Sequence, residues 1–155
     1  RRFRSKTCTR RRRRPQWSAI CDLTMIAIDT NILARALLEY DPTQSEQAQA
    51  LLEANVCSVS LSVILELSWV LARLYGSTRT ECVAALRGVL AADCLVVERS
   101  DDVARALDWA ERGMDFADAL HLASAPAAER FVTFDRAFIR AAQQLETPLP
   151  VSAPP

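Results

Sequence analysis

Four acidic residues occupy positions from which their side chains could do chemistry. Asp29 and Asp135 each stand directly after a short apolar run that predicts a buried strand. Asp118 lies near the start of a helical stretch, and Glu66 interrupts a strongly apolar one. Carboxylate oxygens without a His or Cys cluster are ligands that suit Mg²⁺ or Mn²⁺. If the four side chains converge, bound ions would support phosphodiester hydrolysis, in which one ion activates water.

The three aspartates also have ordinary structural explanations, which stay open at this point. Asp29 and Asp135 could cap the helices that follow them, because aspartate is favoured at the N-cap. Asp118 could be stabilised by the helix dipole in the first turn of its helix. Asp115, three residues earlier, is interpreted as the cap of that helix rather than as an outer metal partner.

Glu66 is harder to explain as a structural residue. It lies within "LSVILELSWVLARL" (61–74), which is apolar on nearly every side and predicts a helix packed in the interior. Its neighbours one turn away include no Lys or Arg that could pair with it. An ionised carboxylate that leaves water destabilises the fold unless a charge or metal compensates it. We therefore expect a partner from elsewhere in the fold, either an arginine or a cation.

Strands and helices are predicted to alternate along the chain. Short apolar runs predict strands over 26–29, 56–60, 94–98, 131–134 and 148–152. Apolar spacing, capping residues and breakers predict helices over 31–39, 41–54, 61–76, 78–91, 100–113, 116–125 and 136–144. Thr78 with Glu81 forms a capping-box pattern, and Ser100 is the expected cap of its helix. The alternation predicts an α/β fold with a mostly parallel sheet of four to five strands.

Ligands of such sheets bind beyond the carboxyl ends of the strands, where Asp29 and Asp135 stand. Four fragments occur around the candidate acids in the order "IDTNIL" (28–33), "VILEL" (63–67), "DFADALHLASA" (115–125) and "VTFDRAF" (132–138). In this order and spacing they resemble the PIN-domain family, and within it the VapC-type toxins of bacterial toxin–antitoxin pairs. The resemblance covers roughly residues 25–150. It implies a three-layer α/β/α sandwich and a Mg²⁺- or Mn²⁺-dependent ribonuclease that cleaves single-stranded RNA.

The resemblance also implies roles for particular residues and partners. By motif position, the residues that match the family's catalytic, metal-binding quartet are Asp29, Glu66, Asp118 and Asp135. Asn31 and Thr133 match polar residues that support this site. The implied partners are RNA, a cognate antitoxin that occludes the acidic cleft, and a second copy in a homodimer. Pro126 departs from the family pattern, because proline ends or kinks the helix that related sequences continue.

Charge divides the chain into a basic segment and an acidic body. Residues 1–24 hold nine Arg or Lys and one Asp, which leaves ten basic and eighteen acidic residues in the remainder. Residues 1–24 are expected to be a disordered extension, 25–150 a single nuclease domain and 151–155 a short tail. Either the extension binds phosphates through its arginines, or the natural protein begins at Met25 and the extension is not native. The alternative function is nucleic-acid binding through this extension, with a catalytically inert acidic body.

Composition excludes several other classes. The single lysine, Lys6, argues against phosphoryl-acceptor aspartate enzymes, which need a lysine in the active site. Three glycines cannot build a P-loop or a dinucleotide-binding loop. Five cysteines without a C-x-x-C pair indicate reduced thiols in a cytoplasmic protein, with Cys57 and Cys94 in the core. No apolar run is long enough to span a membrane.

Other side chains near the predicted acids have open or structural roles. His121 is interpreted as a core residue or a support for Asp118 rather than a general base, because a metal can generate the nucleophile. The aromatic residues interpreted as core or dimer contacts, rather than base-stacking groups, are Trp69, Trp109 and Phe116. Three arginines could either guide phosphates or form solvated helix faces: Arg35, Arg73 and Arg136.

Overall fold

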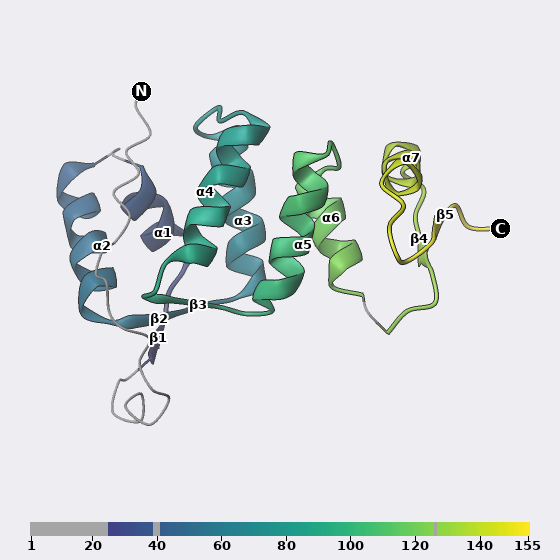
Figure 1. Ribbon diagram of the computed structural model, residues 1–155. Helices are drawn as coiled ribbons and strands as arrows, with labels where there is room; N and C mark the ends of the chain where they lie inside the picture. The colour runs from purple at the N-terminus through teal and green to yellow at the C-terminus, as the bar shows by residue number, and fades with distance from the viewer. Residues whose placement is uncertain (1–24, 39–40, 126) are drawn as a thin grey trace.

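The computed structural model describes residues 25–38, 41–125 and 127–155 of the chain (Figure 1). The strands are β1 (Met25–Ala27), β2 (Val56–Val59), β3 (Leu95–Val97), β4 (Phe131–Val132) and β5 (Val151–Ser152). The helices are α1 (Thr30–Leu37), α2 (Pro42–Ala54), α3 (Leu61–Arg73), α4 (Arg79–Ala91), α5 (Ser100–Glu111), α6 (Phe116–Ala123) and α7 (Arg136–Gln144). The predicted arginine-rich extension and the predicted break at Pro126 lie outside the described residues.

The strands pair in parallel, which confirms the predicted mixed α/β class. β2 lies between β1 and β3, and Cys57 in its centre is opposite Ile26 on one side and Leu95 on the other. Cys57 is fully buried, as predicted, whereas Met25 on the other face of the sheet is half exposed. The main sheet has three strands rather than the expected four to five, because β4 and β5 pair with each other instead.

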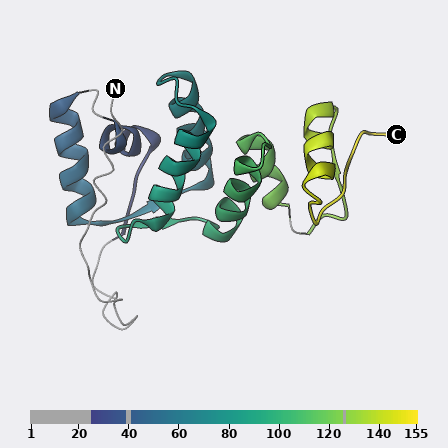
Figure 2. The same ribbon diagram turned by 45° about the horizontal axis from the view of Figure 1, so that its top comes forward.

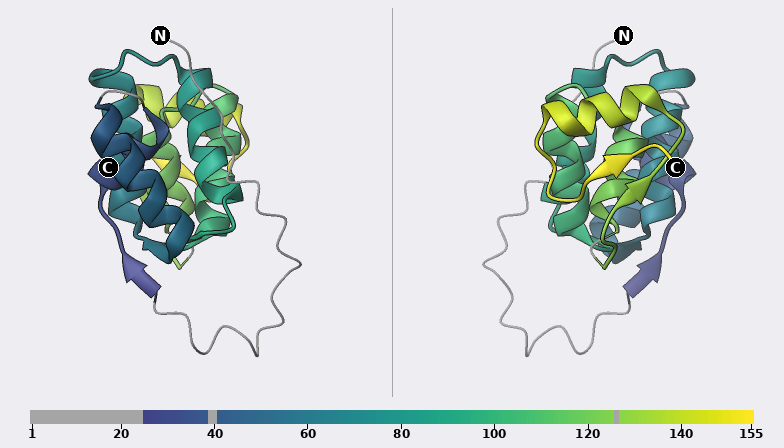
Figure 3. Two further views of the ribbon diagram at one scale, coloured as in Figure 1. Left: turned by 90° about the vertical axis from the view of Figure 1, so that its left-hand side faces the viewer. Right: turned by 90° about the vertical axis from the view of Figure 1, so that its right-hand side faces the viewer.

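The C-terminal elements form a unit of their own. Figures 1 and 2 show β1, α1 and α2 at one end of the molecule, α3 to α6 in the middle, and α7 with β4 and β5 at the other end. The right-hand view of Figure 3 shows α7 lying along β4 and β5. Phe131 of β4 packs against buried Phe138 of α7, with ring centroids 5.2 Å apart. Strand pairing and this aromatic contact therefore hold the unit together.

Local capping explains where most helices begin. The predicted capping box is confirmed, since the Thr78 side chain accepts from the Glu81 backbone and the Glu81 side chain accepts from the Thr78 backbone. The prediction that Ser100 caps α5 is wrong, because Arg99 holds the N-cap position in a left-handed conformation with φ 51°. Arg99 makes no side-chain cap; its guanidinium instead bonds Asp102 of the first turn, with Nε 2.7 Å from Oδ2.

Helix α3 forms the centre of the core. Its Ile64, Leu67 and Leu71 are fully buried. The helix packs against α1, α4 and α6, so it connects its own Glu66 to the helices that begin near Asp29 and Asp118. A search of the helices in the described part of the chain finds none with the length and hydrophobicity of a membrane span.

The burial pattern of α3 predicts different costs for two leucine truncations. Leu67→Ala removes a fully buried side chain and should lower the free energy of unfolding by about 2–5 kcal/mol. Leu74→Ala, at a position that is 66% exposed, should change it by less than about 0.5 kcal/mol. Urea denaturation of the two variants measures the difference. Equal losses of stability would contradict the assigned orientation of α3.

Candidate active site

Asp29 connects the end of β1 to the start of α1. It is the N-cap of α1, and its Oδ1 accepts the Ile32 backbone N–H at 3.1 Å. The capping explanation is therefore confirmed for this residue. A carboxylate has two oxygens, and within the described residues Oδ2 of Asp29 accepts none of the hydrogen bonds found. Capping and ligand binding are thus compatible in one side chain.

Glu66 contacts the residue that follows Asp29. The hydroxyl of Thr30 donates to Oε2 of Glu66 at 2.5 Å, across 36 residues of sequence. Thr30 is itself buried, so its hydroxyl is held in place by the packing of α1. This contact brings the Glu66 carboxylate next to the segment that carries Asp29. Sequence analysis missed Thr30, although a hydroxyl directly after a strand-end aspartate was a visible indication.

The prediction that Glu66 lies in the interior is wrong. Its side chain is exposed, on the side of α3 opposite the buried leucines. Its bonded partner is the Thr30 hydroxyl, and no ion pair found within the described residues involves it, so the arginine alternative finds no support there. A cation as its partner stays a prediction. The error has a physical cause: Trp69 made this face of the helix look apolar in sequence, yet Trp69 is 56% exposed.

Asp118 lies in an acidic environment at the start of α6. Burial raises the pKa of its carboxyl above the ordinary value of 3.8, and the negative charges of Asp115 and Asp135 raise it further. The charge of His121 acts in the opposite direction. Asp115 is the N-cap of α6, as predicted, and its Oδ1 accepts the Ala117 and Asp118 backbone N–H groups. His121 is exposed, so it is not a core residue, and its other predicted role, as a support for Asp118, stays a prediction.

Asp135 is placed by its own helix and by a neighbouring threonine. Its Oδ1 caps α7 by accepting the N–H groups of Ala137 at 2.7 Å and Phe138 at 3.1 Å. Its backbone N–H donates to Oγ1 of Thr133 at 3.0 Å. Thr133 therefore orients the turn that carries Asp135. Within the described residues, no hydrogen bond is found to Oδ2 of Asp135.

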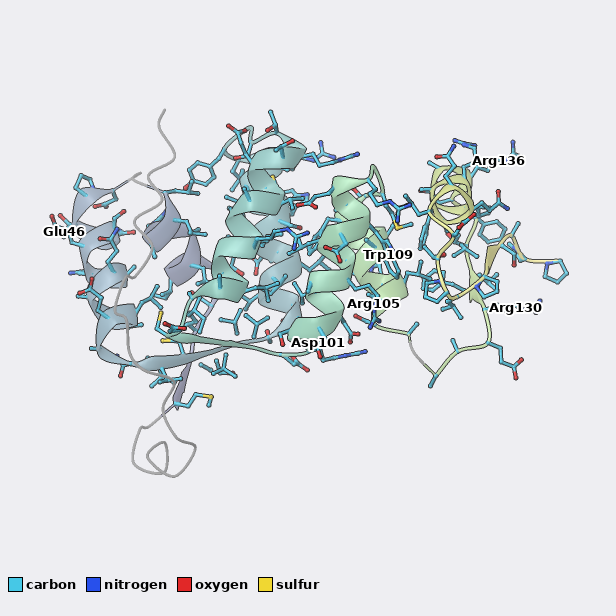
Figure 4. The ribbon with its side chains drawn as sticks, in the orientation of Figure 1. Glu46, Asp101, Arg105, Trp109, Arg130 and Arg136 are labelled. Carbon is cyan, nitrogen blue, oxygen red and sulfur yellow. The ribbon has the colours of Figure 1, made fainter. Side chains whose placement is uncertain are left out.

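The remaining side chains singled out in the sequence have varied surroundings. Asn31 is exposed and lines a groove of about 550 Å³ between α1 and α2. Arg35 lines the same groove, and its Nε donates to Oε1 of Gln44 at 2.5 Å. Trp109 on α5 is only 7% exposed and belongs to the core, as predicted (Figure 4). Arg136, labelled on α7 in the same figure, is exposed.

The structure arranges the four predicted acids as two pairs. The first pair is Asp29 with Glu66, connected through Thr30. The second is Asp118 with Asp135, which are close enough to influence each other electrostatically. β1 and β4, whose ends carry Asp29 and Asp135, lie on opposite sides of α3 to α6 (Figures 1 and 2). Among the described residues, no three acidic, His or Cys side chains are placed so that they could hold a metal ion together.

The chemistry of the donor set nevertheless fits a hard divalent cation. All four predicted ligands are carboxylates, and the capping aspartates each keep one oxygen outside their helix cap. Such oxygens suit Mg²⁺ or Mn²⁺ better than softer metals. A shared cation would also offset the negative charges of Asp115 and Asp135, which add to burial in raising the pKa of Asp118.

Comparison with known families identifies the family of this chain. The family model described as "PIN domain" matches residues 26–144, which is more than half of the chain. The chain belongs to the PIN domain family. PIN domains are generally nucleases, so membership assigns the chain to nucleic-acid hydrolases at this coarse level. No match was found among curated proteins. All four acids of this PIN domain lie inside the matched range.

The environment of Asp118 predicts a pH-dependent stability. Because folding raises its pKa, the folded PIN domain holds this proton more tightly than the unfolded chain does. Ionisation of Asp118, as pH rises from about 3.8 through the raised pKa, therefore lowers stability. Asp118→Asn should stabilise the protein at pH 7, and this gain should shrink as pH falls toward 4.

Urea denaturation of the wild type and Asp118→Asn, in EDTA across this pH range, measures the effect. Asp101→Asn provides a matched control, because Asp101 is an exposed first-turn acid of α5 (Figure 4). A loss of stability in Asp118→Asn at pH 7 would contradict the assigned electrostatics.

Proposed function

We propose that this PIN domain is a Mg²⁺- or Mn²⁺-dependent endoribonuclease that cleaves single-stranded RNA and acts as the toxin of a type II toxin–antitoxin pair. The observation that carries the proposal is the hydrogen bond between Thr30 and Glu66. It brings a carboxylate from α3 to the carboxyl end of β1, where Asp29 stands. Two carboxylates held near that edge of a parallel sheet are typical of a ligand site rather than of a packed core.

The proposed ligands of the ion are Asp29, Glu66, Asp118 and Asp135. When bound, Mg²⁺ or Mn²⁺ lowers the pKa of water and stabilises charge that develops on the scissile phosphate. The proposal requires the two pairs of acids to share the ion. Mutual repulsion between the carboxylates opposes such an approach unless a cation offsets it. Within the second pair, burial and then the negative charges of Asp115 and Asp135 already raise the pKa of Asp118.

The surrounding residues have positioning roles in this proposal. Thr30 holds Glu66 through its hydroxyl, and Thr133 fixes the turn of Asp135. Asn31, exposed two residues after Asp29, is available to contact the substrate. The helix caps of Asp29 and Asp135 fix the direction of each carboxylate, so little side-chain freedom is lost when a ligand binds.

The proposed protein partners are those that the family resemblance implies, a cognate antitoxin and a second copy of the chain. A cognate antitoxin would inhibit the nuclease by inserting a basic side chain between the carboxylates, where Asp29 and Glu66 are both exposed. A homodimer is part of the same proposal. Co-expression of the antitoxin should block cleavage by the wild type, and size-exclusion chromatography with light scattering should give the mass of two chains.

Replacing the acids one at a time tests the proposed nuclease. Asp29→Asn and Glu66→Gln should each lower cleavage of a labelled single-stranded RNA in Mg²⁺ by roughly 10²-fold or more, since loss of even a supporting metal contact costs 10–100-fold. Glu46→Gln is the matched control, because Glu46 is an exposed glutamate on α2, away from β1 (Figure 4). EDTA should abolish the wild-type activity, and excess Mg²⁺ should restore it.

Two outcomes separate this proposal from its alternative. If the chain only binds nucleic acid through its basic extension, removing residues 1–24 abolishes binding, and the acid variants bind as the wild type does. If it is the proposed nuclease, the same deletion spares metal-dependent cleavage. Persistent cleavage by purified Asp29→Asn protein in EDTA would overturn the proposed mechanism.

A further inference from the structure

One exposed stripe of α3 contains more than the predicted acid. The spacing of Ser62, Glu66, Trp69 and Arg73 places them on one side of the helix, opposite the buried Ile64, Leu67 and Leu71. All four residues are exposed. We call these four residues the α3 stripe. The stripe continues directly from the carboxylate that contacts Thr30.

Trp69 is the unusual member of the α3 stripe. It is 56% exposed, whereas Trp109 on α5 is only 7% exposed (Figure 4). An indole on the surface leaves a large apolar area in water, which disfavours this position unless another molecule covers it. Its neighbours on the stripe are polar or charged, so the patch is one aromatic group rather than a broad apolar face. This composition suits a flat ligand with a charged backbone.

Arg73 supplies the charge on the same stripe. It is exposed at the end of α3, and no ion pair found within the described residues involves it. Along a helix that rises about 1.5 Å per residue, Trp69 lies roughly 4.5 Å and Arg73 roughly 10 Å beyond Glu66. An acid, an aromatic ring and a cation therefore follow one another in a line.

We propose that Trp69 and Arg73 bind the single-stranded RNA beside the reaction centre. Trp69 stacks on one unpaired base, and Arg73 contacts a phosphate farther along the strand. This inference rests on the proposed nuclease function and adds the substrate-binding surface to it. Stacking on an aromatic side chain needs a free base face, which single strands offer and duplexes do not. The α3 stripe therefore selects single-stranded substrate.

Binding is measured first, without cleavage. In the Asp29→Asn background, fluorescence anisotropy of a labelled single-stranded RNA of mixed sequence gives the dissociation constant. Trp69→Ala should raise this constant roughly five- to hundred-fold, the range expected when one base–aromatic stack is lost. Trp69→Tyr should restore most of the affinity, because an aromatic face remains. RNA should quench tryptophan emission more in the parent protein than in Trp69→Tyr, which keeps Trp17 and Trp109.

Two matched variants control for surface area and charge. Leu74→Ala removes an exposed apolar side chain from the end of the same helix, off the α3 stripe, and should bind RNA as the parent does. Arg73→Ala should weaken binding and reduce its salt dependence. Arg105→Ala removes the same charge from α5, where Arg105 pairs with Asp102 at 3.4 Å, and should leave binding unchanged (Figure 4).

Cleavage by the otherwise wild-type protein then separates this inference from the proposed function. Trp69→Ala should raise KM and leave kcat nearly unchanged, as expected for an interaction that binds ground state and transition state alike. If Trp69→Ala binds RNA with the affinity of the parent, the stacking inference is wrong and the proposed nuclease function is unaffected. The same conclusion follows if Trp69→Ala changes only the oligomeric state and keeps its RNA affinity. If RNA binding depends on Trp69 but no Mg²⁺-dependent cleavage is found, the proposed nuclease function is wrong and the proposed stacking surface is still supported.

Discussion

Backbone capping is the interaction that places the aspartates at the helix starts of the candidate site. Asp29, Asp115 and Asp135 each begin a helix by accepting backbone N–H groups with a single oxygen, Oδ1. A helix N-terminus favours negative charge, so the fold gains stability from acids at these positions. These hydrogen bonds restrict the side-chain torsion angles, so the position of the second oxygen, Oδ2, is fixed as well. A structural role and a chemical role are therefore not rival explanations of these residues.

Helix α3 lies at the centre of the molecule, between the helices that begin near Asp29 and Asp118. Its buried face, which includes Leu67, packs into the core, and it contacts both α1 and α6. Its exposed face carries Glu66 and Trp69. Because α3 contacts both helices, it fixes the position of Asp29 and Glu66 relative to α6, which carries Asp118. Asp135 is held separately, by the unit of β4, β5 and α7. Packing of α3 therefore places three of the four acids, and the C-terminal unit places Asp135.

Sequence predicted the features that depend on nearby residues and missed those that depend on distant ones. The caps at Asp29, Asp135 and Thr78 could be predicted because side chain and backbone lie within three residues of each other. The contact of Thr30 with Glu66 spans 36 residues, and no local pattern encodes it. The pairing of β4 with β5, rather than with the main sheet, likewise joins residues far apart in the sequence, so local patterns do not predict it.

Electrostatics explains why an acidic nuclease would need a group such as Trp69. Residues 25–155 contain eighteen acidic and ten basic side chains, so their net charge repels the phosphates of RNA. Binding that relied on charge alone would have to overcome this repulsion with few arginines, some of which are already paired to acids of α5. Base stacking does not depend on net charge and is screened little by salt. An exposed indole next to Glu66 therefore supplies attraction where the acids, necessary for the metal, would otherwise drive the substrate away.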